Sequence, residues 1–118
     1  MSQMTLYGIS TCDTCRKAKA WFEDRSVSYR WVDLRDQPPD SERIARWVGS
    51  IGSKPLRNTS GRSYRALGDA KKAYDDTAWI AAFAADPMLL KRPVVEWGAE
   101  VVCAGFRPEE LERVISGE

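Results

Sequence analysis

The 118-residue chain contains no histidine. This absence excludes a Ser-His-Asp triad, a Cys-His protease pair and any histidine metal site. A nucleophile in this protein must therefore be activated by its surroundings and not by an imidazole base. Cysteine is also scarce, because only Cys12, Cys15 and Cys103 are present. Three cysteines cannot all be paired within a permanent disulfide framework. The count is better explained by one pair of thiols that is oxidised reversibly.

An excess of one charge sign and a long apolar run are missing too. The chain has 18 Lys and Arg against 17 Asp and Glu, a net charge of +1, which argues against a dedicated nucleic-acid surface. No apolar run approaches the ~18 residues of a membrane span, and no charged-then-apolar leader precedes the first strand. We therefore expect a cytoplasmic protein, in a compartment that keeps thiols reduced, without membrane contact or direct nucleic-acid binding.

Length and hydrophobic periodicity predict one domain over residues 1–118 with a core of its own. Strands at residues 4–7 and 29–34 flank a helix at 14–24, which suggests a right-handed parallel unit. Valine-rich segments on either side of Trp97-Gly98 predict an antiparallel hairpin, and a last helix follows Pro108. The predicted fold class is α/β, a mixed β-sheet flanked by helices.

The middle of the chain, about residues 38–91, reads as a helical insertion between the two halves. Asp40 or Ser41 is expected to cap one helix, and a second one is expected to start between residues 75 and 77. Residues 53–63 are polar and rich in turn formers, so we predict an exposed loop there.

The stretch with the clearest chemistry is the Cys-x-x-Cys pair between the first predicted strand and helix. A helix N-terminus carries about half a positive charge and free backbone N–H groups. These groups stabilise a thiolate, so a thiol placed there loses its proton more easily. Arg16 and Lys17 add positive charge in the next turn. Cys12 is therefore the candidate nucleophile, with Cys15 as a second thiol one turn away.

Other interpretations of the cysteines stay open at this point. The pair could be two inert, small, buried residues, or two ligands of a zinc site, although only Cys103 is left as a further soft ligand. A phosphatase-like anion loop needs Cys, five residues and then Arg, but six positions after Cys12 stands Ala18. Cys103 ends an apolar strand, so we expect a buried core thiol there.

Taken together, four segments resemble the arsenate reductase (ArsC)/Spx family, over nearly the whole chain. The segments are residues 6–18 with the cysteine loop, 58–65 with the central loop, 86–94 with Lys-Arg-Pro-Val, and Gly105-Phe106. Within this family the chain is most similar to the short YffB-like proteins, which have been proposed as glutathione-dependent thiol reductases.

The resemblance implies a thioredoxin-like fold in which Arg92–Pro93 is a cis peptide bond beside the nucleophile. It implies that Cys12 is catalytic and that Cys15 is a candidate resolving cysteine. The substrate-binding residues that it implies are Arg92, Pro93, Asn58 and Thr11. No metal and no bound cofactor are expected, and glutathione is the expected co-substrate.

The chain departs from the family's arsenate reductases, which hold the oxyanion with three arginines. Only Arg92 stands on a matching position, because Asn58 and Gly105 occupy the other two, with Arg57 and Arg107 nearby. One fixed arginine should hold a triply charged oxyanion poorly. The expected function is thus thiol–disulfide oxidoreduction, with glutathione or a glutaredoxin-type reductant and a disulfide or small oxyanion as substrate. The alternatives are a Spx-like redox-sensing protein that contacts RNA polymerase, and a structural domain without redox function.

Overall fold

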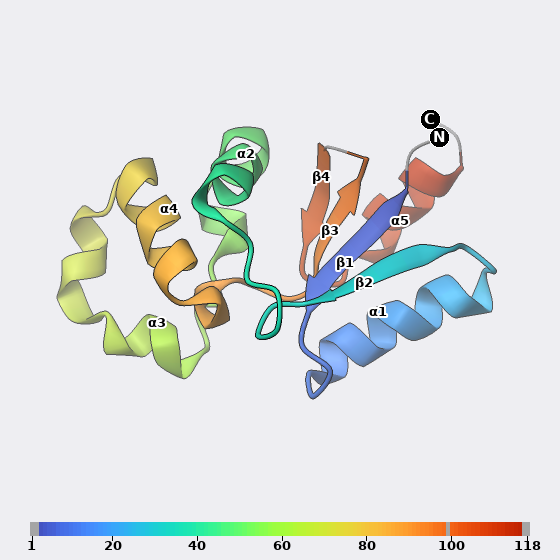
Figure 1. Ribbon diagram of the computed structural model, residues 1–118, viewed down its shortest axis with the longest axis horizontal. Helices are drawn as coiled ribbons and strands as arrows, with labels where there is room; N and C mark the ends of the chain where they lie inside the picture. Colours follow the sequence, from blue (N-terminus) through green and yellow to red (C-terminus); the bar gives the residue numbers. More distant parts are fainter. Residues whose placement is uncertain (1–2, 99, 117–118) are drawn as a thin grey trace.

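The computed structural model describes residues 3–98 and 100–116 and shows a four-stranded sheet with helices on both faces (Figure 1). The strands are β1 (Met4–Gly8), β2 (Tyr29–Asp33), β3 (Val94–Trp97) and β4 (Glu100–Ala104). Their order in the sheet is β2-β1-β3-β4. Strand β1 runs parallel to β2 and antiparallel to β3, and β3 runs antiparallel to β4. The predicted mixed sheet is thereby confirmed.

The helices fall into two groups. Helix α1 (Asp13–Asp24) joins β1 to β2, and α5 (Pro108–Ile115) follows β4. The segments between β2 and β3 are α2 (Ser41–Ile51), η1 (Lys54–Leu56), α3 (Arg62–Ala66), η2 (Gly68–Ala73), α4 (Asp76–Ala85) and η3 (Pro87–Leu89). Figure 1 shows this second group beside the sheet, on the side away from α1. Within residues 3–98 and 100–116, no helix is long and apolar enough to cross a membrane.

The two long helices of the middle segment begin at aspartate caps. The side chain of Asp40 accepts a hydrogen bond from the backbone N–H of Arg43, and Asp75 accepts one from Ala78, each at 2.9 Å. Such caps satisfy one of the N–H groups that a helix start leaves unpaired, and each contributes about 1 kcal/mol. This places the starts of α2 and α4 within the ranges that the sequence predicted.

Alternation along the strands builds two cores, one on each face of the sheet. Met4 and Leu6 of β1 pack with the buried residues of α1 and α5, while Tyr7 packs with those of α2 and α4. A strand sends successive side chains to opposite faces, so one short strand supplies both cores. Each large apolar side chain buried in this way contributes roughly 1.5–3 kcal/mol.

The exposed loop predicted over residues 53–63 is wrong in its first half. Leu56 in η1 is 0% exposed and Ser53 is 4% exposed. Arg57 forms an isolated antiparallel bridge with Leu90. A single leucine within a polar stretch gives no periodic signal, which explains why the sequence did not reveal this pairing.

A buried acid ties helix α2 to the sheet. Glu96 is 2% exposed and accepts hydrogen bonds from the Tyr7 hydroxyl at 3.0 Å and the Trp47 indole N–H at 2.6 Å. The Arg43 guanidinium lies 3.0 Å from each carboxylate oxygen. A buried carboxylate is tolerated only when it is paired and hydrogen-bonded in this way.

Candidate active site

Cys12 is the N-cap residue of helix α1. Its backbone is extended, with φ −89° and ψ 123°, and the helix begins at the next residue. The Cys12 carbonyl accepts the first helical hydrogen bond from Arg16 at 3.0 Å, and its N–H donates to the Ile9 carbonyl at 3.2 Å. These bonds fix the half-buried thiol at the positive end of the helix dipole.

The surroundings of Cys12 favour its ionised form. Burial is the largest influence and by itself would raise the pKa of this thiol. The backbone N–H and the thiol of Cys15, the N–H of Thr14 and the charge of Arg92 oppose it, and together they lower the pKa of Cys12 below its ordinary value. Because the thiolate is the nucleophile, this shift increases the reactive fraction at neutral pH.

Cys15 has the opposite character. Its side chain is 0% exposed, and burial raises its pKa to about 12, with the hydrogen bond and charge of Cys12 acting in the same direction. Both thiols are free in this structure. The two thiols therefore differ: Cys12 is half-buried and its pKa is lowered, whereas Cys15 is buried and its pKa is raised.

A cleft of about 320 Å³ opens in front of the Cys12 sulfur. Its lining comes from four separate segments and consists of Cys12, Thr14, Asn58, Ser60, Lys91, Arg92, Gly105 and Phe106. The structure thus brings together three of the predicted site residues. Two cations and no carboxylate are among these lining residues, so the cleft suits an anionic ligand.

The other predicted residues lie outside this lining. Thr11 is exposed in the turn before α1, and Thr14, one helical turn along, lines the cleft in its stead. Cys15 lies beneath Cys12 in the core. Pro93 is buried behind the cleft, and its peptide bond with Arg92 is cis.

Arg92 is held rigidly. Its Nη1 donates to the carbonyl oxygens of Met88 at 3.1 Å and Leu90 at 3.2 Å. Its Nε is buried and has no hydrogen-bond partner among the described residues. The Nε of Arg57 is buried without a partner as well, so it is the two carbonyl bonds that fix Arg92 in the lining of the cleft. Arg92 therefore offers a fixed positive charge to the cleft.

Arg57 does not replace the arginine that Asn58 lacks. Its guanidinium donates to the Ser53 hydroxyl at 2.7 Å and lies 4.3 Å from the centre of the Trp79 ring. Asn58 is anchored by its N–H, which donates to the Leu89 carbonyl at 2.8 Å. Neighbouring residues of an extended segment point to opposite sides. The side chain of Asn58 therefore lines the cleft, while the guanidinium of Arg57 lies against Ser53 and Trp79 in the helical insertion.

Arg107 does not replace the arginine missing at Gly105 either. It is the exposed N-cap residue of α5, where its Nε lies 4.0 Å from a carboxylate oxygen of Glu109, and it does not line the cleft. Sequence reasoning missed another cation, Lys91, which does line the cleft. Its position next to Arg92 in the Lys-Arg-Pro-Val motif was the available signal.

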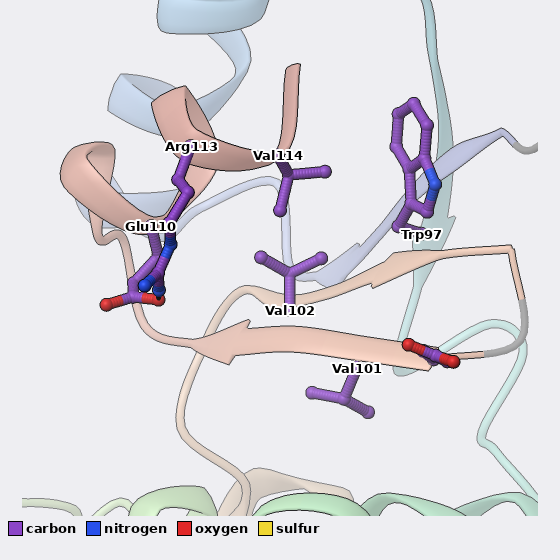
Figure 2. Close-up of a pocket in the computed structure, with 7 residues that line it drawn as sticks. Trp97, Val101, Val102, Glu110, Arg113 and Val114 are labelled. Atoms are coloured by element: carbon purple, nitrogen blue, oxygen red, sulfur yellow. Dashed lines mark hydrogen bonds and ion pairs between the residues drawn. The ribbon is translucent and has the colours of Figure 1, made fainter. Parts of the chain in front are cut away.

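A larger hollow, of about 440 Å³, lies between the β3–β4 hairpin and α5 (Figure 2). Val102 and Val114 point toward each other across it, and Glu110 and Arg113 form an ion pair at one end. Its lining includes no cysteine. The smaller cleft at Cys12 is therefore the candidate active site.

The fold and the site define the class of the protein. A βαβ unit followed by a β-hairpin and a last helix, with a cysteine at the start of the first helix, is the arrangement of thioredoxin-like proteins. The chain belongs to the ArsC family, because the sequence model of that family matches residues 7–114. The resemblance seen in the sequence is thus confirmed.

Individual relatives agree with this assignment. The chain is 34% identical over 113 residues to the uncharacterised protein YusI of Bacillus subtilis, covering 92% of this chain and 95% of YusI. The solved structure of a YffB protein matches with a TM-score of 0.86 at 34% identity, covering 94% of this chain and 97% of that one. A possible arsenate reductase from Streptococcus mutans matches with a TM-score of 0.84 at 34% identity, covering 95% and 99%.

A more distant relative carries a different function in its name. The global transcriptional regulator Spx of Lactiplantibacillus plantarum is 23% identical over 112 residues, which cover 93% of this chain and 84% of the regulator.

Proposed function

We propose that this protein is a thiol–disulfide oxidoreductase that uses the Cys12 thiolate and takes its electrons from glutathione. One observation carries the proposal: the only reachable activated thiol among the described residues lies in a cleft that holds two cations and no carboxylate. A site of this kind suits attack on a sulfur whose substituents bear negative charge.

The reaction balances in two exchanges. The Cys12 thiolate attacks the glutathione sulfur of a mixed disulfide, the S–S bond breaks, and the released thiolate takes a proton from water. A glutathione thiolate then attacks the same sulfur, so that oxidised glutathione leaves and the Cys12 thiolate is restored. The disulfide is reduced and two glutathione sulfurs end as one disulfide, so no metal or bound cofactor takes part.

The structure supports a route with one working cysteine. Cys15 is covered and its pKa is raised to about 12, so it is a poor attacking group in the reduced protein. Resolution by Cys15 would depend on this buried thiol losing its proton after Cys12 has reacted, although its side chain already contacts Cys12. A second glutathione would approach the adduct from the cleft that Cys12 lines.

Arsenate is a weak substrate in this proposal. Three arginines hold the oxyanion in the family's arsenate reductases, whereas Asn58 and Gly105 leave Arg92 as the one arginine lining this cleft. An arsenate anion loses bidentate partners at both missing positions. We expect arsenate turnover to be far slower than disulfide turnover.

The test is a turnover assay with bis(2-hydroxyethyl) disulfide and glutathione, coupled to NADPH oxidation by glutathione reductase. Cys12→Ser should abolish turnover, while Cys15→Ser should retain most of it. Cys103→Ser serves as the matched control, because this thiol is buried in the other core. Wild-type turnover equal to that of Cys12→Ser would overturn the proposal.

A regulatory role is the second candidate, and the Spx relative together with the Cys12–Cys15 spacing favours it. In that case oxidation of the pair would change a surface that binds RNA polymerase. Purified polymerase should then bind the oxidised protein and release it after reduction, and Cys15→Ser should lose this dependence. Binding that ignores the redox state would exclude this role.

A further inference from the structure

The side chain of Lys91 occupies the space that a side chain at position 105, directly after β4, would need. A Cβ built on Gly105 would lie 2.9 Å from Lys91 Cε and 3.4 Å from its Cδ. Gly105 also has a φ of +83°, which side-chain-bearing residues rarely adopt. Gly105 therefore leaves the room through which the Lys91 stem passes along the cleft.

Backbone hydrogen bonds hold both Lys91 and Gly105 in place. The N–H of Lys91 donates to the Leu56 carbonyl at 2.7 Å, and the N–H of Gly105 donates to the Pro93 carbonyl at 2.8 Å. The short pairing between residues 56–58 and 89–91 therefore determines where the lysine emerges. Lys91 is placed by the fold even though its ammonium group is exposed.

The Lys91 ammonium is available for a ligand. No ion pair or hydrogen bond formed within residues 3–98 and 100–116 uses it. A lysine ammonium is a compact charge on a flexible stem, whereas an arginine guanidinium is a rigid fork. Beside the pinned Arg92, the cleft thus combines one fixed and one adjustable cation.

We propose that Lys91 is a specificity-determining residue that selects disulfides carrying carboxylates. This inference rests on the proposed oxidoreductase function. A fixed and an adjustable cation suit an organic ligand whose negative groups are separated, whereas a compact oxyanion needs several rigid donors around one point. With glycine at position 105, the cleft has no oxyanion-binding side chain there, and the space is left for Lys91 to reach a carboxylate of the ligand.

The chemical step itself does not involve the lysine. The Cys12 thiolate attacks the disulfide, a new S–S bond to Cys12 forms, and the leaving thiolate is protonated by water. Cys12 is oxidised to a mixed disulfide and the leaving sulfur is reduced. Since the proposed contact of Lys91 is with the carboxylate of the substituent and not with the reacting sulfurs, loss of Lys91 should slow the reaction of anionic disulfides more than that of neutral ones.

The experiment measures the rate constant of a single exchange with three small disulfides, in a Cys15→Ser, Cys103→Ser background. The probes are anionic 3,3′-dithiodipropionate, neutral bis(2-hydroxyethyl) disulfide and cationic cystamine. Lys91→Gln should lower the anionic-to-neutral rate ratio about fivefold, the effect of losing one partly exposed ion pair. Lys91→Arg should keep most of the ratio.

A matched control removes a charge from the helix that carries the nucleophile. Lys17 is exposed on α1 and does not line the cleft, so Lys17→Gln should leave the ratio within twofold of that of the Cys15→Ser, Cys103→Ser parent. An equal fall in both variants would mean a general field effect and would overturn the assignment to Lys91. So would an unchanged ratio in Lys91→Gln.

The same data separate this inference from the proposed function. If the Cys15→Ser, Cys103→Ser parent reacts with the neutral disulfide no faster than free glutathione does, the oxidoreductase proposal fails. If the neutral reaction is fast and the ratio ignores Lys91, only the selectivity inference fails.

Discussion

The sulfur of Cys15 occupies the space that any side chain at position 8 would need. A Cβ on Gly8 would come within 2.5 Å of the Cys15 Sγ and 3.0 Å of the Trp31 ring. The last residue of β1 and the second cysteine of α1 therefore fit together only because one of them is glycine. This contact sets how closely the helix start, and with it Cys12, approaches the end of the strand.

Gly8→Ala should therefore destabilise the protein by about 1–3 kcal/mol, the usual cost of overpacking a core. Urea unfolding measures this change. Adding Cys15→Ala should restore part of the loss, since it removes the nearer obstacle. Gly49→Ala in α2 is the matched control: nothing lies within 4 Å of the added carbon, so a neutral effect or a gain of up to about 1 kcal/mol is expected. A Gly8→Ala protein as stable as wild type would disprove the tight fit.

The three thiols should differ strongly in reactivity. Burial raises the pKa of Cys15 to about 12 and that of Cys103 to about 11, whereas the pKa of Cys12 is lowered. Iodoacetamide at neutral pH should thus label Cys12 first, and the other two only as the protein unfolds. Peptide mass spectrometry over time gives the order. Labelling of Cys15 in step with Cys12 under native conditions would contradict this asymmetry.

Arg92 should contribute to the ionisation of Cys12. Its positive charge is one of the influences that lower this pKa, so Arg92→Met should move the midpoint of the alkylation–pH profile upward. The sign follows from the thiolate being the reactive form: at a fixed neutral pH, the variant should react more slowly. The sequence pointed to Lys17 as a further activating cation, but this residue lies outside the cleft and is not among the main influences on the pKa of Cys12. Lys17→Met should therefore leave the midpoint in place. A midpoint unaffected by Arg92→Met would remove this residue from the electrostatics of the site.

Sequence reasoning found the parts of the site that depend on local structure. The helix start at Cys12 follows from a strand, a turn and a periodic apolar face, all of which are visible in neighbouring residues. The orientation of Arg57 and the path of Lys91 depend instead on the pairing between residues 56–58 and 89–91. That pairing joins segments more than thirty residues apart, and neither has the periodicity of a strand. Burial of Leu56 was missed for the same reason.

The network around Glu96 should make stability depend on alkaline pH. Burial, followed by the charge and the hydrogen bond of Glu96, raises the pKa of Tyr7 to about 12, against an ordinary value of 10.0. The folded protein then keeps a proton that the unfolded chain loses. The stabilising contribution of Tyr7 is therefore complete below about pH 10 and is lost as the pH rises through about 12.

Tyr7→Phe tests this relationship because it removes the titrating hydroxyl and keeps the ring. The hydroxyl donates to Glu96 at 3.0 Å and accepts from Arg43 at 2.8 Å. At neutral pH its removal should therefore cost about 1–3 kcal/mol, the net value of two hydrogen bonds, while Arg43 and Trp47 still satisfy the carboxylate. Between pH 10 and 12 the difference from wild type should shrink, because the wild-type protein alone loses the Tyr7 contribution there. Urea unfolding at several pH values measures both effects. A stability difference that stays constant up to pH 12 would mean that Glu96 does not raise the pKa of Tyr7. The buried carboxylate would then be stabilised by Arg43 and Trp47 alone.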